Sequence, residues 1–239
     1  WSSNGKLLNS VTNAAGQQTA FTYYTNGQSV DALKDSTDTE GRKTSYIYGD
    51  SNHPLLPTEV KVLDTNGITI LHWQKFSYDS KGRVLSEKTV QPDDDTVVLQ
   101  QVTRTYYSTG NGNGLLESVT QVDIDNAANN NATTYTYDAA GRVVKTQQSS
   151  LFGSCQISYT VIDSAGNAIA SICNYENSGV SPETAAQATA LYNPAFPDKN
   201  HVTTYEYDAI GRRVKTTTNA GASYAQTSVT VYDGLNRVV

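Results

Sequence analysis

The sequence predicts an all-β protein made of consecutive antiparallel hairpins in a continuous twisted sheet. Three observations predict this fold. Asp-x-x-Gly turn signals recur along the chain, the segments beside these turns show the two-residue alternation of side chains that is typical of strands, and the composition favours strands. The 239 residues include 16 Tyr and 17 Gly but no Met, and 37% of them are hydrophobic. Tyr, Val and Thr suit a pleated, half-buried surface, so the chain has the composition of a large sheet.

Four Tyr-Asp pairs mark the clearest hairpins, and in three of them Gly-Arg follows the Asp at three and four residues. An Asp at the first position of a type I turn accepts hydrogen bonds from nearby backbone N–H groups, and the Gly supplies the positive φ that closes the turn in a bulge. Turns are therefore predicted at Ser80-Lys81, Ala139-Ala140 and Ala209-Ile210. The residues of this structural repeat motif are, in chain order, Tyr78, Asp79, Gly82, Arg83, Tyr135, Tyr137, Asp138, Gly141, Arg142, Tyr205, Tyr207, Asp208, Gly211, Arg212, Tyr232 and Asp233.

The strands beside the second turn illustrate the expected register. Regular pairing around residues 138–142 places Tyr137 opposite Val143 and Tyr135 opposite Lys145, with both tyrosines on one face. Cross-strand aromatic pairs stabilise such a ladder by roughly 0.5–1 kcal/mol each. The tyrosines expected to act as register pins, by stacking on one another and on Val143 or Val214, are Tyr135, Tyr137, Tyr205 and Tyr207.

Weaker copies of the hairpin fill much of the remaining chain. They include TDTEGRKTSYIYG from Thr37, LDTNGITIL from Leu63 and VIDSAGNAIASI from Val161. The spacing between clear copies is uneven, which indicates an elaborated array of hairpins and not a strict solenoid. We therefore expect residues 1–239 to form one repeat region.

One stretch after the last weak copy interrupts the strands. Ser181 suits a helix N-cap, Pro182 suits the first helical position, and an Ala-rich run ends before Asn193. We expect a helix of about ten residues within an insertion at about 181–192. The insertion could contact a partner or cargo, or it could be a surface feature packed by its own apolar residues, and the second role is favoured.

The sequence offers no constellation of catalytic, cofactor-binding or metal-binding residues. His53, His72 and His201 fall in different repeats, without the spacing of a metal site. The acidic run Asp93–Asp95 could hold a cation, but a solvated loop is favoured because the spaced ligands of a calcium loop are missing. The polar stretch 123–131 could bind calcium or sugar, but a flexible hairpin tip is favoured. The turn aspartates are explained by turn geometry, so we predict no enzyme, no cofactor and no bound metal.

Charge and hydropathy exclude two further classes. The net charge is −6, and basic residues are scattered near turns, which argues against nucleic-acid binding through the phosphate backbone. No apolar run approaches the ~20 residues of a membrane-spanning helix, so no membrane span is predicted. The chain starts at Trp1 and contains no Met, so we expect it to be a piece of a longer protein.

The two cysteines lie on either side of one predicted hairpin. Regular pairing places Cys155 opposite Tyr175 and Cys173 opposite Ile157, on one face but diagonally offset. At that offset the Cβ atoms are ~7 Å apart, whereas a disulfide needs ~4 Å. Two buried free thiols are therefore favoured over a disulfide, which a bulge would permit.

The motif Tyr-x-Tyr-Asp-x-x-Gly-Arg-Val, present at Tyr135–Val143 and with an extra Arg at Tyr205–Val214, resembles the YD repeat of the RHS superfamily. That family includes bacterial RHS polymorphic toxins, the B and C components of insecticidal Tc toxin complexes and, distantly, animal teneurins. The resemblance covers nearly the whole chain and implies that the hairpins form part of a hollow shell, which encloses a toxic segment in bacterial members. The family's self-cleaving module has no counterpart here, because Asp93 follows Pro92 instead of preceding it.

Two functions are consistent with this resemblance. The first is a non-catalytic wall segment of a toxin-encapsulating shell, secreted by or associated with the surface of a bacterium. Its partners would be the rest of its parent shell, an enclosed toxin cargo and, through exposed sheet edges, other copies of itself. The second is a carbohydrate-binding repeat module at a cell surface. The sequence favours the wall, because Tyr recurs at register-fixing positions and not in one local cluster.

Overall fold

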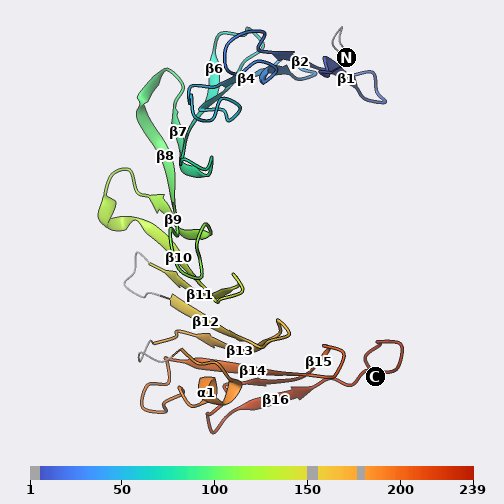
Figure 1. Cartoon of the computed structure of the whole chain (residues 1–239), viewed down its shortest axis with the longest axis vertical. Coiled ribbons are helices and arrows are strands. Elements are labelled where there is room, and N and C mark those ends of the chain that lie inside the picture. Colours follow the sequence, from blue (N-terminus) through green and yellow to red (C-terminus); the bar gives the residue numbers. More distant parts are fainter. Residues whose placement is uncertain (1–5, 150–155, 177–180) are drawn as a thin grey trace. The chain divides into compact units, whose positions relative to one another are not determined.

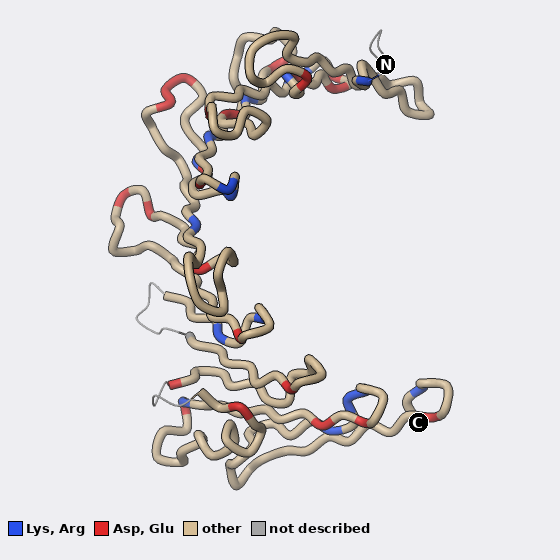
Figure 2. Tube along the Cα trace, viewed as in Figure 1, with Lys and Arg blue, Asp and Glu red and all other residues tan. Residues whose placement is uncertain are grey.

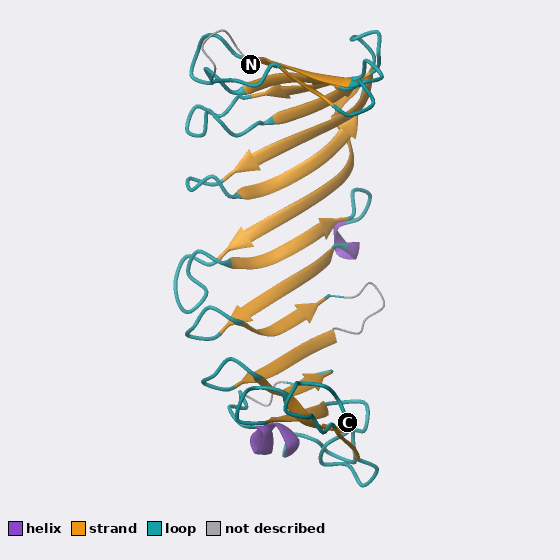
Figure 3. Ribbon diagram, turned by 90° about the vertical axis from the view of Figure 1, so that its right-hand side faces the viewer, coloured by secondary structure: helices purple, strands orange, loops and turns teal. Residues whose placement is uncertain are grey.

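A computed structural model describes residues 6–149, 156–176 and 181–239. It contains sixteen strands in one sheet, and each strand is hydrogen-bonded to its neighbours in chain order (Figures 1 and 3). The strand pairs whose register is defined are all antiparallel. The predicted all-β fold of consecutive hairpins with one short helical insertion is therefore confirmed.

The chain divides into two units, Trp1–Arg104 with Thr120–Asn130 and Thr105–Val119 with Asn131–Val239. The first unit contains seven whole strands and most of β8. These strands are β1 (Ser10–Thr12), β2 (Gln18–Tyr23), β3 (Leu33–Thr37), β4 (Lys43–Ile47), β5 (Glu59–Leu63), β6 (Ile70–Tyr78), β7 (Val84–Gln91) and β8 (Asp94–Tyr106). The boundary passes through β8 and β9 (Leu116–Val122). The second unit continues with β10 (Asn131–Tyr137), β11 (Val143–Gln148), β12 (Gln156–Ile162), β13 (Ala168–Cys173), α1 (Ala185–Thr189), β14 (His201–Tyr207), β15 (Arg213–Thr218) and β16 (Gln226–Val229).

The three predicted turns lie where the motif places them. In the turn between β10 and β11, the N–H of Gly141 donates to the carbonyl oxygen of Asp138 at 3.0 Å, and the N–H of Asp138 donates to that of Arg142 at 2.9 Å. Gly141 has φ +76°, a conformation that side chains with a Cβ adopt at a cost. The turns after Asp79 and Asp208 repeat both backbone bonds.

A bulge beside each turn changes the register that regular pairing predicts. Tyr137 lies opposite Val143 as expected, but the register then shifts by one residue, so Tyr135 pairs with Thr146 and not with Lys145. The same shift occurs between β6 and β7, β12 and β13, and β14 and β15. The extra residue enters the second strand directly after its first residue, and a bulge of this kind increases local twist.

This bulge also corrects the predicted cysteine register. Cys173 pairs with Ser158, not with Ile157, and its side chain is exposed instead of buried. Cys155 lies outside the described residues.

Most side chains of the sheet are partly exposed, and the main buried cluster lies in the second unit. Ile172 of β13 and Val202 of β14 are fully buried there, and Ala188 of α1 covers them. The helix lies against β13 and β14 (Figure 3). This local second layer is where the sheet gains a packed core.

The insertion carries a shorter helix than predicted, because its N-cap is Thr184 and not Ser181. The Thr184 hydroxyl accepts the N–H of Gln187, whose side chain in turn accepts the N–H of Thr184, so the two residues form a capping box. The helix ends at Ala190, five helical residues later. Pro182 therefore precedes the cap instead of occupying the first helical position.

The two acidic stretches lie at the tips of hairpins, between β7 and β8 and between β9 and β10, and Asp93–Asp95 are exposed. Asp94 and Asp95 belong to β8, where Asp95 forms an ion pair with Lys75. In the other stretch, the carboxylate of Asp123 accepts backbone N–H groups of Asp125 and Asn126, ahead of a short 3-10 turn. In both stretches, carboxylates therefore stabilise the local backbone or pair with a neighbouring strand.

The first unit buries a carboxylate as well as the apolar residues Val90 and Ala32. Asp35 is 8% exposed and accepts hydrogen bonds from Thr22 at 3.0 Å and Ser45 at 2.6 Å, with the ammonium group of Lys43 at 3.1 Å. Burial alone would raise the pKa of Asp35, but these partners outweigh it and lower the pKa. The charged form is therefore satisfied where the three strands meet.

Candidate functional site: the Asp turns and the seams between hairpins

The Asp138 turn shows the chemistry of the repeat at atomic detail. One carboxylate oxygen of Asp138 accepts the N–H groups of Ala140 and Arg142, each at 2.9 Å, and the other accepts Nε of Arg142 at 2.7 Å. The backbone N–H of Arg142 is the main cause that lowers the pKa of Asp138, and the guanidinium group adds to it. The Asp therefore organises the turn as an ionised acceptor.

The same arrangement recurs in turns that the sequence marked clearly and in one that it marked weakly. In the Asp79 turn, the side chain of Arg83 is the main cause that lowers the pKa of Asp79 to about 2. The weak copy at Asp38 forms the full set of bonds with Arg42, although a Thr precedes it instead of a Tyr. Its Asp-x-x-Gly-Arg spacing, without the Tyr, is the signal by which the sequence marked it as a weaker copy.

The last copy has Asn236 where the others have Gly. Asn236 adopts φ +63°, and Asn tolerates this left-handed region better than most residues. The carboxylate of Asp233 accepts the N–H groups of Leu235 and Arg237 and the Nε of Arg237, as in the other copies. The fourth Tyr-Asp pair thus forms the same turn without the glycine.

The tyrosine before each turn binds the backbone of the preceding strand. In the second unit, Tyr137 at the end of β10 donates its hydroxyl to the carbonyl oxygen of Leu116 at 2.8 Å, and Tyr207 at the end of β14 donates to that of Ala168 at 2.8 Å. Each acceptor is the first residue of the preceding strand. Burial raises the pKa of Tyr137, which keeps the hydroxyl in its donor form.

The first unit uses the same contact in one clear copy of the repeat and at two tyrosines outside the motif. Tyr78 donates to the carbonyl oxygen of Pro57 at 2.6 Å, and burial raises its pKa. Two tyrosines outside the predicted motif do the same, Tyr23 to Leu8 and Tyr48 to Leu33, each at 2.8 Å. The signal that could have found them is a Tyr at the end of alternate strands.

These contacts close places that we call seams. The turns at Asp138, Asp163 and Asp208 of the second unit lie along one edge of the sheet and join every second pair of neighbouring strands. The chain joins the remaining pairs at the opposite edge. We call the end of such a pair that lies among these Asp turns a seam. In the second unit the seams are β9/β10, β11/β12, β13/β14 and β15/β16. Because no turn joins the two strands there, side-chain contacts add to the backbone hydrogen bonds that pair the strands.

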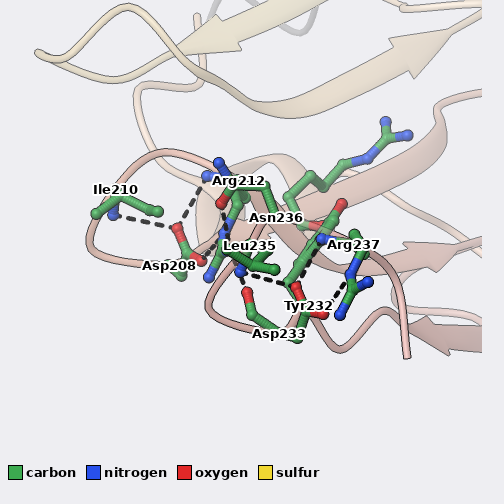
Figure 4. Close-up of polar contacts among 9 residues, drawn as sticks. Asp208, Ile210, Arg212, Tyr232, Asp233, Leu235, Asn236 and Arg237 are labelled. Carbon is green, nitrogen blue, oxygen red and sulfur yellow. Dashed lines mark hydrogen bonds and ion pairs between the residues drawn. The ribbon is translucent and has the colours of Figure 1, made fainter.

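A second kind of contact runs from one turn to the next across two of these seams. Nη1 of Arg142 donates to the carbonyl oxygen of Asp163, and Nη1 of Arg212 donates to that of Asp233, both at 3.3 Å. Figure 4 shows the second case, in which Arg212 also donates to the side-chain oxygen of Asn236 at 2.7 Å. The Arg of the repeat thus serves its own turn with Nε and the following turn with Nη1.

The contacts of the motif tyrosines differ from the predicted stacking of these tyrosines on one another. Tyr137 meets Tyr107 edge to face, with ring centroids 6.1 Å apart, and the turn residue Gly112 makes room for both rings. A Cβ on Gly112 would lie 2.6 Å from the Tyr107 ring. The hydroxyl of Tyr205 lies 3.0 Å from the hydroxyl of Ser171 in the neighbouring strand β13. Tyr135 takes part through its backbone, because its carbonyl oxygen accepts the hydroxyl of Tyr107.

The described residues show little that resembles a reaction centre. No group of three metal-ligating side chains occurs among them, and His53 is paired with Asp50 at 2.9 Å. A groove of about 500 Å³ in the second unit is lined by Lys145, Tyr159 and Glu183 among others, together with Asp138, which its turn already uses. Charged residues of both signs lie together at the turns (Figure 2).

No helix in the described part of the chain has the length and apolar character needed to cross a membrane.

Fold and turns together define a class: a hairpin-repeat sheet with Asp-organised turns and side-chain-closed seams. No protein-family model and no curated protein matches the chain. Solved structures do match its fold. The crystal structure of TcdB2-TccC3 without its hypervariable C-terminal region aligns over 93% of this chain at 17% identity, with a TM-score of 0.60. That of TcdB2-TccC3-TEV aligns over 95% at 14% identity, with a TM-score of 0.56.

The chain spans about a tenth of these solved chains, 10% and 12% respectively. The structure of the Photorhabdus luminescens Tc holotoxin pore with the mutation TccC3-D651A aligns over 97% of this chain at 17% identity, with a TM-score of 0.45. At identities below a fifth, the likeness establishes the fold. The continuous sheet of consecutive hairpins that the resemblance implied is therefore a fold that this chain shares with these structures.

Proposed function

We propose that this chain is a non-catalytic wall segment of a shell built from YD-type hairpins, and that the shell encloses a toxin. The observation that supports this most is the single sheet in chain order, in which the main buried apolar cluster of the described residues is a small patch under α1. A compact domain of this length buries a larger core. A segment of shell wall, by contrast, needs a long continuous sheet whose seams are closed.

The motif residues have structural roles in this proposal. The turn aspartates and arginines shape each hairpin, and Tyr78, Tyr137, Tyr207 and Tyr232 hold it to the strand before it. The partners are the remainder of the parent shell and an enclosed segment, in a secreted or surface-associated location. The fold relationship to TcdB2-TccC3 supports this assignment.

The carbohydrate-binding alternative is not favoured by the tyrosine contacts. A sugar site needs exposed rings and free polar groups, whereas Tyr137 and Tyr207 use their hydroxyls on backbone carbonyl groups. The aromatic residues are also spread along the turn edge of each unit. A glycan array on which binding collapses after mutation of a single Tyr would restore this alternative.

The experiment for the wall role uses the full-length parent protein. Seams of the wall are weakened by the double variant R142Q/Y207F, and the rate at which an added protease cleaves the enclosed segment is measured. The expected result is faster cleavage than in the wild type, with R237Q as a matched control because Arg237 serves its own turn. Equal cleavage rates in all three proteins would contradict the wall role.

A further inference from the structure

The seams of the second unit are not all closed in the same way. At β13/β14 the Tyr207 hydroxyl bridges the strands, while the turn residue that would reach forward is Asn167, whose amide binds its own Asp163 at 3.2 Å. At β11/β12 the position equivalent to Tyr207 is Ile162, which carries no hydroxyl. There the guanidinium of Arg142 reaches Asp163.

At β15/β16 both devices are present. Tyr232 donates to the carbonyl oxygen of Arg213 at 3.3 Å, and Arg212 donates to that of Asp233. The two side chains also touch, because the Arg212 guanidinium lies 4.7 Å from the centre of the Tyr232 ring, a cation–π geometry. In the described part of the second unit, a seam that lacks one device therefore has the other.

We infer that the tyrosine hydroxyl and the turn arginine are interchangeable devices for closing a seam, and that each seam requires at least one of them. The physical reason is that both supply a donor to a backbone carbonyl group at the turn edge, where no covalent connection exists. The carbonyl groups of Asp163 and Asp233 keep the N–H that their own turns donate, but without the arginine the bond across the seam is lost, so the strands separate more readily there. The inference rests on the proposed function only for its biological purpose.

The rule assigns seam-closing roles to particular residues. Of the two devices, the described residues show only the Arg142 guanidinium at β11/β12 and only the Tyr207 hydroxyl at β13/β14, where Tyr205 also bonds Ser171 further along the strands. At β15/β16, Arg212 and Tyr232 back each other up. It also defines two rescues by position: a tyrosine at 162 would reach the carbonyl of Val143, the first residue of β11, and an arginine at 167 would reach the carbonyl of Asp208. These acceptors follow from the other copies.

Amide hydrogen exchange on the chain itself tests the rule. R142Q should speed exchange of the β11 and β12 amides roughly two- to tenfold, the effect of one lost hydrogen bond on local opening. R212Q should change the β15/β16 seam less, because Tyr232 remains. R237Q removes the same contact with its own Asp, Nε to Asp233 at 2.7 Å, and should leave the other seams unchanged.

The rescues separate a seam role from a general loss of turn stability. I162Y added to R142Q should restore slow exchange in β11 and β12, and N167R added to Y207F should do so in β13 and β14. Failure of both rescues, or equal effects of R142Q and R237Q on β11 and β12, would overturn the rule. Open seams with unchanged protease protection in the parent would instead reject the proposed wall function and leave the rule standing.

Discussion

The turn aspartate combines two jobs that different residues usually share. The carboxylate of Asp138 satisfies N–H groups inside the turn and holds the arginine that follows. Fixing that arginine's Nε leaves its outer nitrogen atoms directed toward the next turn, which is why a short motif can act beyond its own hairpin. A bidentate role of this kind suits the planar guanidinium group and not a lysine ammonium group.

Replacing Gly141 by Val should destabilise the chain more than replacing Arg142 by Gln. Val would be forced into φ +76°, at about 1–2 kcal/mol for a residue with a Cβ, and branching adds to this. Space is not the cause, since a Cβ at this position would lie at an ordinary 3.6 Å from its nearest neighbour, Leu115. Thermal melts of the two variants rank the effects, and the opposite order would show that the turn type is wrong.

Acid should weaken the turns between about pH 4 and pH 2. The pKa of Asp79 is lowered from 3.8 to about 2 in the folded chain, chiefly by the side chain of Arg83. A lowered folded-state pKa stabilises the fold above the unfolded-state value, and this contribution is lost as the pH falls through the folded-state value. Melting temperatures from pH 6 to pH 2 should therefore fall less steeply below pH 4 for Asp79→Asn than for wild type. Parallel curves would contradict the role of this carboxylate.

At the level of elements, the sequence was sufficient to predict hairpins and turns because their cause is local. Asp, Gly and the residues between them fix a turn without help from distant parts, so all three predicted turn positions are confirmed. The glycine bulge inside each turn was predicted, but the second bulge, after the first residue of the following strand, was missed. This second bulge changes the partner of Tyr135 from Lys145 to Thr146. An extra residue in one strand leaves no distinct mark in an alternating Val-rich segment.

The seam contacts could not be predicted either, because they join residues that lie far apart in sequence. Tyr207 and its acceptor Ala168 are separated by the whole insertion. The start of the short helix was predicted wrongly for a related reason. Ser181 and Thr184 are both suitable N-cap residues, and Thr184 is the cap because the side chain of Gln187 folds back to complete the capping box.

The insertion should matter through what it covers. Ile172 has no exposed surface, and α1 lies over it. Ile172→Ala should lower the free energy of unfolding by about 2–5 kcal/mol through lost burial and a cavity. The matched control is Ile68→Ala, since Ile68 is 82% exposed and its truncation should change stability by less than about 0.5 kcal/mol. Denaturant titrations that gave equal effects would refute the placement of the core.

At the scale of the whole molecule, the strand order leaves β1 and β16 as the outermost named strands. Edge strands offer backbone groups to other strands, although a net charge of −6 opposes close approach of two copies. We expect the isolated chain to self-associate more strongly as ionic strength rises, because salt screens that repulsion. Sedimentation velocity at several salt concentrations measures this, and a monomer at every concentration would count against exposed edges.

The proposed wall role requires this chain to be part of a larger sheet and not an independent domain. An electron cryo-microscopy map of the full-length parent protein tests this, because it shows where the residues corresponding to β1–β16 lie. We expect these strands to continue a larger sheet, with one face toward an enclosed volume and the other toward solvent. A map in which the same residues form a separate body outside any enclosed volume would contradict it.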